Sequence, residues 1–189
     1  LILYVGEIEA GEHAVAPFKK LAAPLADMLH AMRYPEIFQP EEPGYHPTAV
    51  SRNLFINQVD RAAAELILER LEASDAPLRV AQLRVLGGAV ARVPADATAY
   101  AHRQAPIMVN LAAFYQGEGD RAAKQAWMDE FAAALPHKAA GAYVNFLGLE
   151  GPVYLQAAYP GKTGQRLAQI KARFDPDNFF CMNHNIKPQ

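Results

Sequence analysis

The sequence predicts an α+β fold, with a mostly antiparallel or mixed sheet and helices packed on one face. Two observations support this prediction. The predicted strands are apolar on one side only, whereas the strands of a doubly covered parallel sheet are apolar throughout. Predicted helices separate most of these strands along the chain. With 189 residues, 51% hydrophobic and 20% charged, the chain can bury the core of one domain.

The N-terminal stretch is expected to begin with a strand and continue as a helix. Residues 1–9 are rich in apolar, β-branched side chains, which is typical of a strand. Apolar residues at helical spacing predict a helix over 12–29, which Pro24 would kink or split. Residues 41–47 have the turn chemistry of a loop.

The middle of the chain is expected to hold three strands and a helix. Residues 50–56 alternate weakly as a strand, and Asp60 can cap a following helix that ends before Pro77. Two further strands are predicted over 78–86 and 106–115.

The last third is expected to contain two helices around one strand. Asp120 is predicted to cap a helix that carries Trp127 on its inward face. Residues 141–147 are predicted to form a strand with Tyr143 and Asn145 on one face. The final helix is expected to stop at Asp175-Pro176, since proline cannot continue it.

Composition excludes several classes of function. A net charge of −2 gives no basic field for nucleic acid and no basic run for a membrane surface. No metal-site spacing and no apolar run long enough to span a bilayer are present. Cys181 cannot form an internal disulfide and is expected to be a buried thiol, while His46 and His137 are expected to be solvated. No signal peptide is visible, so we expect a cytoplasmic or secreted protein, and the start without methionine suggests a piece of a longer one.

Three segments in a fixed order carry a family resemblance. The first combines Gly87-Gly88-Ala89 with the Thr98-to-Arg103 stretch TAYAHR, and the second is Tyr143-Val144-Asn145. The third is the tail, in which a DPDNFF turn is followed by Asn183, Ile186 and Pro188. Together they resemble the C-terminal part of the berberine-bridge-enzyme-like FAD-linked oxidases, of the vanillyl-alcohol oxidase (PCMH-type) superfamily. Tails are usually frayed, so the aromatic residues of this one predict that it docks.

The resemblance implies a ferredoxin-like substrate domain over 1–172 and a segment over 173–189 that returns to an upstream FAD-binding domain. In the intact enzyme Asn183, with Asn145 and Asn185, would contact FAD, which this chain alone would not retain. Tyr143 would be the catalytic base and remove the proton of an alcohol substrate while hydride passes to flavin N5. A phenol needs help from neighbours to accept a proton at neutral pH. Oxygen would be the final acceptor.

Four further residues are implied as substrate contacts: Asn110, His102, Arg103 and Tyr34. Plant members with a glutamate base carry it near the position of Asn110. An amide cannot act as a base, so this difference favours tyrosine-based oxidation of a sugar or natural-product hydroxyl.

Structural alternatives stay open for each of these residues. Tyr143 also suits core packing, and His102-Arg103 also suits a turn followed by a solvated strand edge. The chain as a whole could instead be a non-catalytic module that binds a small molecule or a partner, or a sheet-based oligomerisation domain.

Overall fold

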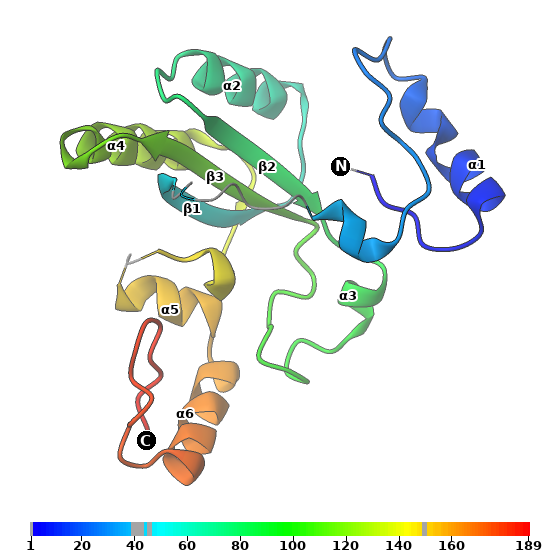
Figure 1. The fold of residues 1–189 in the computed structure, drawn as a ribbon. Coiled ribbons are helices and arrows are strands. Elements are labelled where there is room, and N and C mark those ends of the chain that lie inside the picture. The colour runs from blue at the N-terminus through cyan, green and yellow to red at the C-terminus, as the bar shows by residue number, and fades with distance from the viewer. Residues whose placement is uncertain (1, 39–43, 45–46, 149–150) are drawn as a thin grey trace. The chain divides into compact units, whose positions relative to one another are not determined.

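The computed structural model describes residues 2–38, 44, 47–148 and 151–189 (Figure 1). The chain divides into two compact units, Leu1–Tyr45 and His46–Gln189, and each is described by itself. The first unit holds α1 (Ile8–Lys19) and the 3₁₀ helix η1 (Tyr34–Ile37). The elements of the second unit are β1 (Thr48–Ile56), α2 (Arg61–Glu72), β2 (Arg79–Val85), α3 (Ala89–Arg92), β3 (Ile107–Tyr115), α4 (Glu118–Ala134), β4 (Lys138–Ala139), the 3₁₀ helix η2 (Val144–Phe146), α5 (Pro152–Ala158) and α6 (Lys162–Phe174).

The predictions for the first unit were wrong in two respects. No strand forms over 2–9, and α1 begins at Ile8, within that range. The helix predicted over 12–29 ends at Lys19, where Lys20 N and Leu21 N close the last turn with 3₁₀-type bonds. Pro24 disfavours helical geometry just beyond, so the later apolar residues stay exposed. Most of the predicted loop at 41–47, including His46, lies outside the described residues.

The sheet of the second unit confirms the predicted α+β class. Its four strands are antiparallel neighbours in the order β2-β3-β1-β4. Strands and sheet-covering helices follow one another as β1-α2-β2-β3-α4-β4, which is the ferredoxin-like arrangement. Pairing is in register along the centre, with Asn53 opposite Asn110 and Leu54 opposite Val109.

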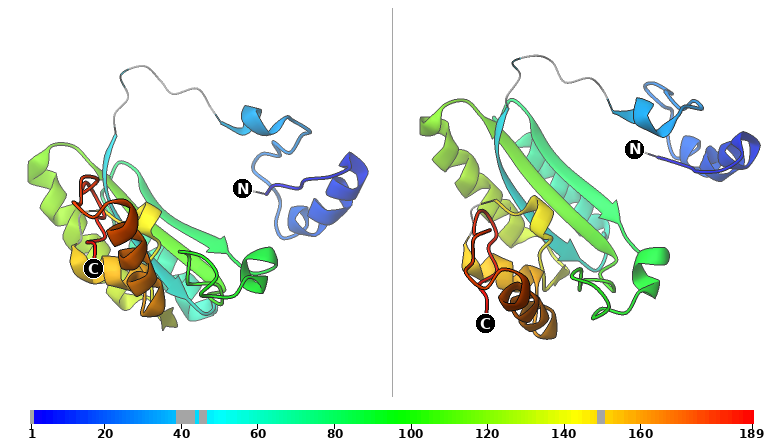
Figure 2. Two further views of the ribbon diagram at one scale, coloured as in Figure 1. Left: turned by 90° about the horizontal axis from the view of Figure 1, so that it is seen from below. Right: turned by 60° about the horizontal axis from the view of Figure 1, so that its bottom comes forward.

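The core lies on one face of this sheet, where α2 and α4 pack (Figure 2). Alternate residues of the central strands point to it, as the two-residue period requires. From β1 and β3 these are Val50, Leu54, Ile56, Val109, Leu111 and Ala113, and the helices add Ile67, Met128 and Phe131. The predicted placement of helices on one face is therefore confirmed for α2 and α4.

Two of the predicted helix ends, the start of α2 and the end of α6, are confirmed, and the predicted cap of α4 is wrong. Asp60 caps α2 by accepting from Ala63 N at 2.8 Å, and α6 ends at Phe174, before Pro176, both as predicted. Asp120 is not the cap of α4, which begins after Gly117. Asp120 instead pairs with Lys124, whose buried Nζ also binds Asp75 at 2.7 Å.

The strand predicted over 141–147 is wrong. β4 ends at Ala139, Gly141 has a φ of +127°, and residues 144–146 form η2. A short apolar run with aromatic residues has the same composition in a strand and in a buried turn, and here no neighbouring strand pairs with it. No helix in the described ranges is long and apolar enough to cross a membrane.

Candidate functional site

The face of the sheet opposite α2 and α4 carries a row of amides. Asn53 of β1 lies opposite Asn110 of β3, which lies opposite Gln82 of β2. All three point to the same face, because paired residues in an antiparallel sheet share a side. The register therefore places three amide side chains in one line across three strands.

Residues 142–146 cross this amide-bearing face. The main-chain N of Tyr143 donates to Oδ1 of Asn53 in β1 at 2.5 Å. The ring of Phe146 lies under the guanidinium of Arg84 in β2, at 4.6 Å from its centroid. Because β1 and β2 flank β3, the segment lies over the centre of the sheet. Gly141 permits the turn into it, since a Cβ there would overlap the His102 ring.

Tyr143 and Asn145 lie together, although by a geometry that differs from the predicted strand. Nδ2 of Asn145 donates to Oη of Tyr143 at 2.8 Å. The Tyr143 ring also packs edge-on against Tyr100, at a centroid distance of 5.7 Å, and contacts Phe146 at 5.5 Å. The phenol oxygen therefore sits beside a donor, on a ring held by two aromatic neighbours.

His102 fastens α5 to the sheet. Its ring stacks on Phe55 at 4.8 Å, and its Nε2 lies 3.0 Å from the carbonyl oxygen of Ala157. Burial lowers the pKa of His102 below its usual 6.5, with hydrogen bonds to Ala157 and Ala158 opposing the shift. The imidazole is thus neutral at neutral pH and donates from Nε2 to the carbonyl.

Arg103 supports the ring next to Tyr143. Its guanidinium lies 4.9 Å from the Tyr100 ring centroid and donates to Tyr100 O and Thr98 Oγ1. Burial raises the pKa of Tyr100, while the Arg103 charge acts in the opposite direction. Arg103 thus contacts Tyr100, which in turn packs against Tyr143.

The tail turns back toward this region after α6. Lys171 binds Asp175 and also donates to the carbonyl oxygen of Phe180 at 2.6 Å. Asp175 accepts from the main-chain N–H groups of Phe179 and Phe180. Asn183 has a φ of +57°, a conformation that asparagine tolerates better than most residues.

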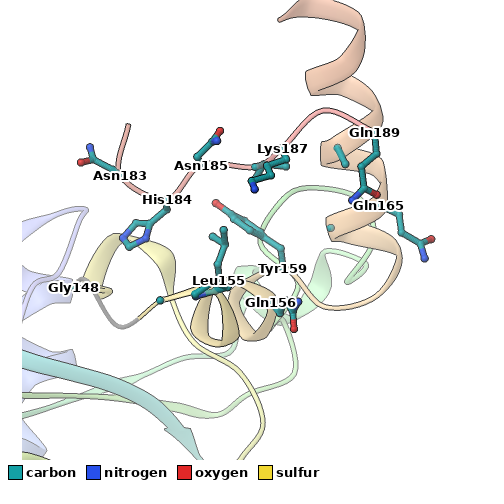
Figure 3. A pocket seen from close by; sticks show the side chains of 15 residues that line it. Gly148, Leu155, Gln156, Tyr159, Gln165, Asn183, His184, Asn185, Lys187 and Gln189 are labelled. Carbon is teal, nitrogen blue, oxygen red and sulfur yellow. The ribbon is translucent and has the colours of Figure 1, made fainter. Parts of the chain in front are cut away.

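Two adjoining pockets lie where the tail meets the rest of the unit. The larger, of about 610 Å³, is formed by α5, α6 and the tail (Figure 3). The smaller, of about 360 Å³, is lined by Val144, Asn145, Leu147, Gly148, Asn183 and His184. Gly148, Asn183 and His184 line both, and His184 Nε2 lies 3.1 Å from the carbonyl oxygen of Leu147. The segment that carries Tyr143 and Asn145 and the Asn-rich tail therefore share one hollow.

Known proteins resemble this chain in its C-terminal part. Residues 142–187 match the family model described as "Berberine and berberine like". An uncharacterized FAD-linked oxidoreductase, YgaK, of Bacillus subtilis (strain 168) is 30% identical over 105 residues, which is 56% of this chain and 23% of YgaK. Berberine bridge enzyme-like 28 of Arabidopsis thaliana is 28% identical over 151 residues, covering 68% of this chain and 28% of the relative. The predicted resemblance is confirmed over residues 142–187, which are similar to this family.

Solved structures share the fold. BBE-like #28 from Arabidopsis thaliana has a TM-score of 0.65 at 23% identity, covering 76% of this chain and 34% of that one. A chitooligosaccharide oxidase has a TM-score of 0.64 at 18% identity, covering 76% and 33%. The chain thus spans about a quarter of the curated relatives and a third of the solved chains that it matches.

The predicted site residues fall into two groups. Asn145 and Asn183 line the smaller pocket, and Tyr143 adjoins it through its hydrogen bond with Asn145. Asn185 lines the larger pocket, and the remaining predicted residues of the second unit adjoin Tyr143 through intermediaries. Those intermediaries are Tyr100 for His102 and Arg103, and Asn53 for Asn110. Tyr34 belongs to the first unit, where it is exposed and packs edge-on against Phe38, so its role as a substrate contact stays a prediction.

Three residues escaped sequence reasoning. Asn53 follows Ser51 and Arg52 in β1, so the sequence gives no sign that this amide is buried. Tyr100 lies in the TAYAHR segment, for which only His102 and Arg103 were predicted as site residues. Tyr159 lines the larger pocket, with its hydroxyl toward the tail (Figure 3), and burial raises its pKa.

Of two predictions about reactive side chains, one was wrong and one holds in part. Cys181 is exposed, not buried. His137 is only partly solvated, since its Nε2 lies 2.7 Å from Oδ2 of Asp60 at the start of α2. Within the described ranges no group of three His, Cys, Asp or Glu residues could hold a metal ion.

The hollow fits part of a flavin. Side-chain amides can both donate and accept, as the polar edge of an isoalloxazine ring requires. Asn185 Oδ1 is buried and has no hydrogen-bond partner in the described part of the chain. Asn183 lines the same pocket, and Asn145 lines the adjoining one. No glycine-rich phosphate cradle occurs in the sequence. These residues therefore suit the ring rather than the pyrophosphate.

Proposed function

We propose that this chain is the substrate-domain portion of an FAD-dependent oxidoreductase that oxidises an alcohol, with Tyr143 as the base. The observation that carries the proposal is the smaller pocket, where Asn145, which is hydrogen-bonded to Tyr143, lies beside Asn183 of the tail. Sequence similarity to FAD-linked oxidoreductases supports FAD as the cofactor of the intact enzyme. Residues 1–172 form the substrate domain, and 173–189 form the segment that reaches the flavin domain.

The chain's own residues bind and deprotonate the substrate. In its phenolate form, Oη of Tyr143 accepts the proton of a substrate hydroxyl and becomes a neutral phenol, and Asn145 Nδ2, which donates to that oxygen, stabilises the phenolate before the transfer. The bound flavin supplies the acceptor for the carbon-bound hydride, and oxygen is the final acceptor. Asn110, His102, Arg103 and Tyr34 are the proposed substrate contacts, while Asn183, Asn145 and Asn185 contact the ring.

A sugar or natural-product hydroxyl is the proposed substrate. Support comes from two structural neighbours whose names include chitooligosaccharide oxidase and a glycopeptide hexose oxidase complexed with teicoplanin. The lining is rich in amides and carries one lysine, Lys187, which suits a neutral, hydroxyl-bearing ligand.

Replacing Tyr143 by Phe in the intact flavoenzyme tests the base. We expect the rate of flavin reduction to fall by about 10²–10⁴-fold, the usual worth of a general base, with an unchanged flavin absorbance spectrum. Tyr115→Phe is the matched control, because Tyr115 packs against the core face. A variant that reduces its flavin as fast as the unmodified enzyme would refute the role of Tyr143.

One observation favours a second function, a non-catalytic binding module. The pocket of about 610 Å³ is built entirely from this chain and falls within the size range of small-molecule sites. A module of this kind would bind sugars in the absence of flavin. Calorimetric titration of the chain with oligosaccharides separates the two functions.

A further inference from the structure

Arg52 is a charged residue on the face of the sheet that α2 and α4 cover. It alternates with Val50 and Leu54 of β1, which belong to the core, and its cross-strand partner is the fully buried Leu111. The Arg52 side chain is only 15% exposed. A charge in such surroundings is costly unless it is paired and hydrogen-bonded, so its partners are informative.

The guanidinium of Arg52 binds side chains of two different helices. Nη2 donates to Oδ1 of Asp129 in α4, and Nη1 donates to the hydroxyl of Tyr154 in α5. The guanidinium also lies over the Tyr154 ring, at 4.8 Å from its centroid. Asp129 is held in turn by Nε2 of Gln125, which lies 3.2 Å from both carboxylate oxygens. Arg52 therefore joins α4 to α5.

A second tie holds the other end of α5. The carbonyl oxygen of Ala157 accepts from His102, whose ring stacks on Phe55 of β1. Both ties lead back to the same strand, since Arg52 and Phe55 both belong to β1. The helix is thus fastened to β1 at two points.

The two faces of α5 have different neighbours. Tyr154 and Ala157 are three residues apart, so they lie on the same side of the helix, and both are anchored to β1. Leu155, Gln156 and Tyr159 lie on the other side and line the larger pocket (Figure 3). Since a short hydrogen-bonded helix moves as one piece, a shift of the anchored face carries the pocket face with it.

We propose that Arg52 is a positioning residue for the larger pocket. It ties α5 to α4 and so fixes the distance between the pocket wall formed by α5 and the opposite wall formed by α6 and the tail. Arg52 itself does not contact the substrate. The effect on substrate affinity rests on the proposed function, whereas the position of α5 does not.

Hydrogen exchange in the 189-residue chain tests the position of α5. Arg52→Met keeps an unbranched side chain but removes both bonds, so the amides of residues 156–159 should exchange at least about fivefold faster. The melting temperature should change little, because an apolar side chain often replaces a buried charge pair without loss of stability. Arg61→Met, at an exposed arginine of α2, is the matched control and should leave these amides unchanged.

Two results would overturn the proposal. One is unchanged exchange over residues 156–159 in the folded Arg52→Met variant. The other is equal acceleration of these amides and those of β3, because Arg52 would then stabilise the whole domain and not α5 in particular. Arg52→Lys keeps the charge beside Asp129 but has one nitrogen where the guanidinium has separate donors, so it should rescue part of the protection.

Tyr154→Phe covers the case in which Arg52→Met does not fold. It removes only the hydroxyl that Arg52 binds, so the same amides should exchange about threefold faster. In the double variant the two effects should not add, since both substitutions remove the same bond. Unchanged exchange in Tyr154→Phe, or additive effects in the double variant, would disprove the tie between Arg52 and α5.

Kinetics of the intact flavoenzyme add a readout that stability alone would not move. With chitobiose as the probe substrate, Arg52→Met should raise KM about fivefold and leave kcat within about twofold, because the pocket wall moves and the reacting groups do not. A lowered kcat at unchanged KM would contradict the proposal. If the unmodified enzyme does not oxidise chitobiose, the proposed substrate class is rejected, and the exchange results still decide the position of α5.

Discussion

Single residues set the local shape of the site. Gly141 leaves room for the His102 ring, and the φ of Asn183 turns the tail toward the hollow. Apart from its proposed contact with substrate, His102 has a structural role, because its ring packs against Phe55 and Tyr100 and bonds to the carbonyl oxygen of Ala157. Burial disfavours the charged form of the imidazole, so the arrangement depends on pH.

The stability of the fold should fall as His102 is forced to take up a proton. Burial lowers its pKa below 6.5, so just below that pH the unfolded chain binds a proton that the folded chain excludes. Stability therefore rises with pH through this window and is lost as pH falls through it. His102→Gln keeps a donor for Ala157 O without titrating, and its melting temperature should decline less between about pH 7 and pH 5 than that of the unmodified chain. Parallel declines in the two proteins would contradict this.

At the scale of elements, α6 and the tail act as one piece. Lys171 in the last turn of α6 binds both Asp175 and Phe180 O, and Asp175 accepts the two N–H groups that follow. The Lys171 hydrogen bond is the main reason why the pKa of Asp175 is lowered, so the carboxylate stays charged and this tie persists until strongly acidic pH.

Removing this carboxylate should release the tail. In Asp175→Ala the amides of residues 179–184 should exchange faster, because two of them lose their acceptor and Lys171 loses its partner. Asp177→Ala, at an exposed neighbouring carboxylate, is the matched control. Hydrogen exchange followed by mass spectrometry measures both variants, and equal protection of the tail in the two would disprove the role of Asp175.

At the scale of the molecule, the hollow offers amides for a ring and no cradle for phosphates. The chain also spans about a quarter of the curated relatives that it matches. Most of the contacts that hold a dinucleotide would therefore have to come from elsewhere.

The 189-residue chain should not retain FAD. We expect it to elute from gel filtration without yellow colour and to bind FAD with a Kd weaker than about 10 µM, because ring contacts alone offset little of the cost of association. Fluorescence titration with FAD provides the measurement. A stoichiometric yellow complex would show that the chain holds the whole cofactor.

Sequence reasoning succeeded where neighbouring residues decide the outcome. The Asp60 cap, the end of α6 before Pro176 and the one-sided strands β1 and β3 depend on contacts within a few residues or on the two-residue period. It failed at 2–9 and 141–147, where apolar composition does not reveal whether a neighbouring strand is available.

The sequence by itself determined the family resemblance, the α+β class and the segments that carry Tyr143, Asn145 and Asn183. Tertiary structure alone decided how those side chains meet. The turn at Tyr143 forms over the sheet because an amide ninety residues away accepts its N–H, and the tail faces the same hollow through His184 and Leu147. Such contacts join residues far apart in the chain, so no local pattern records them.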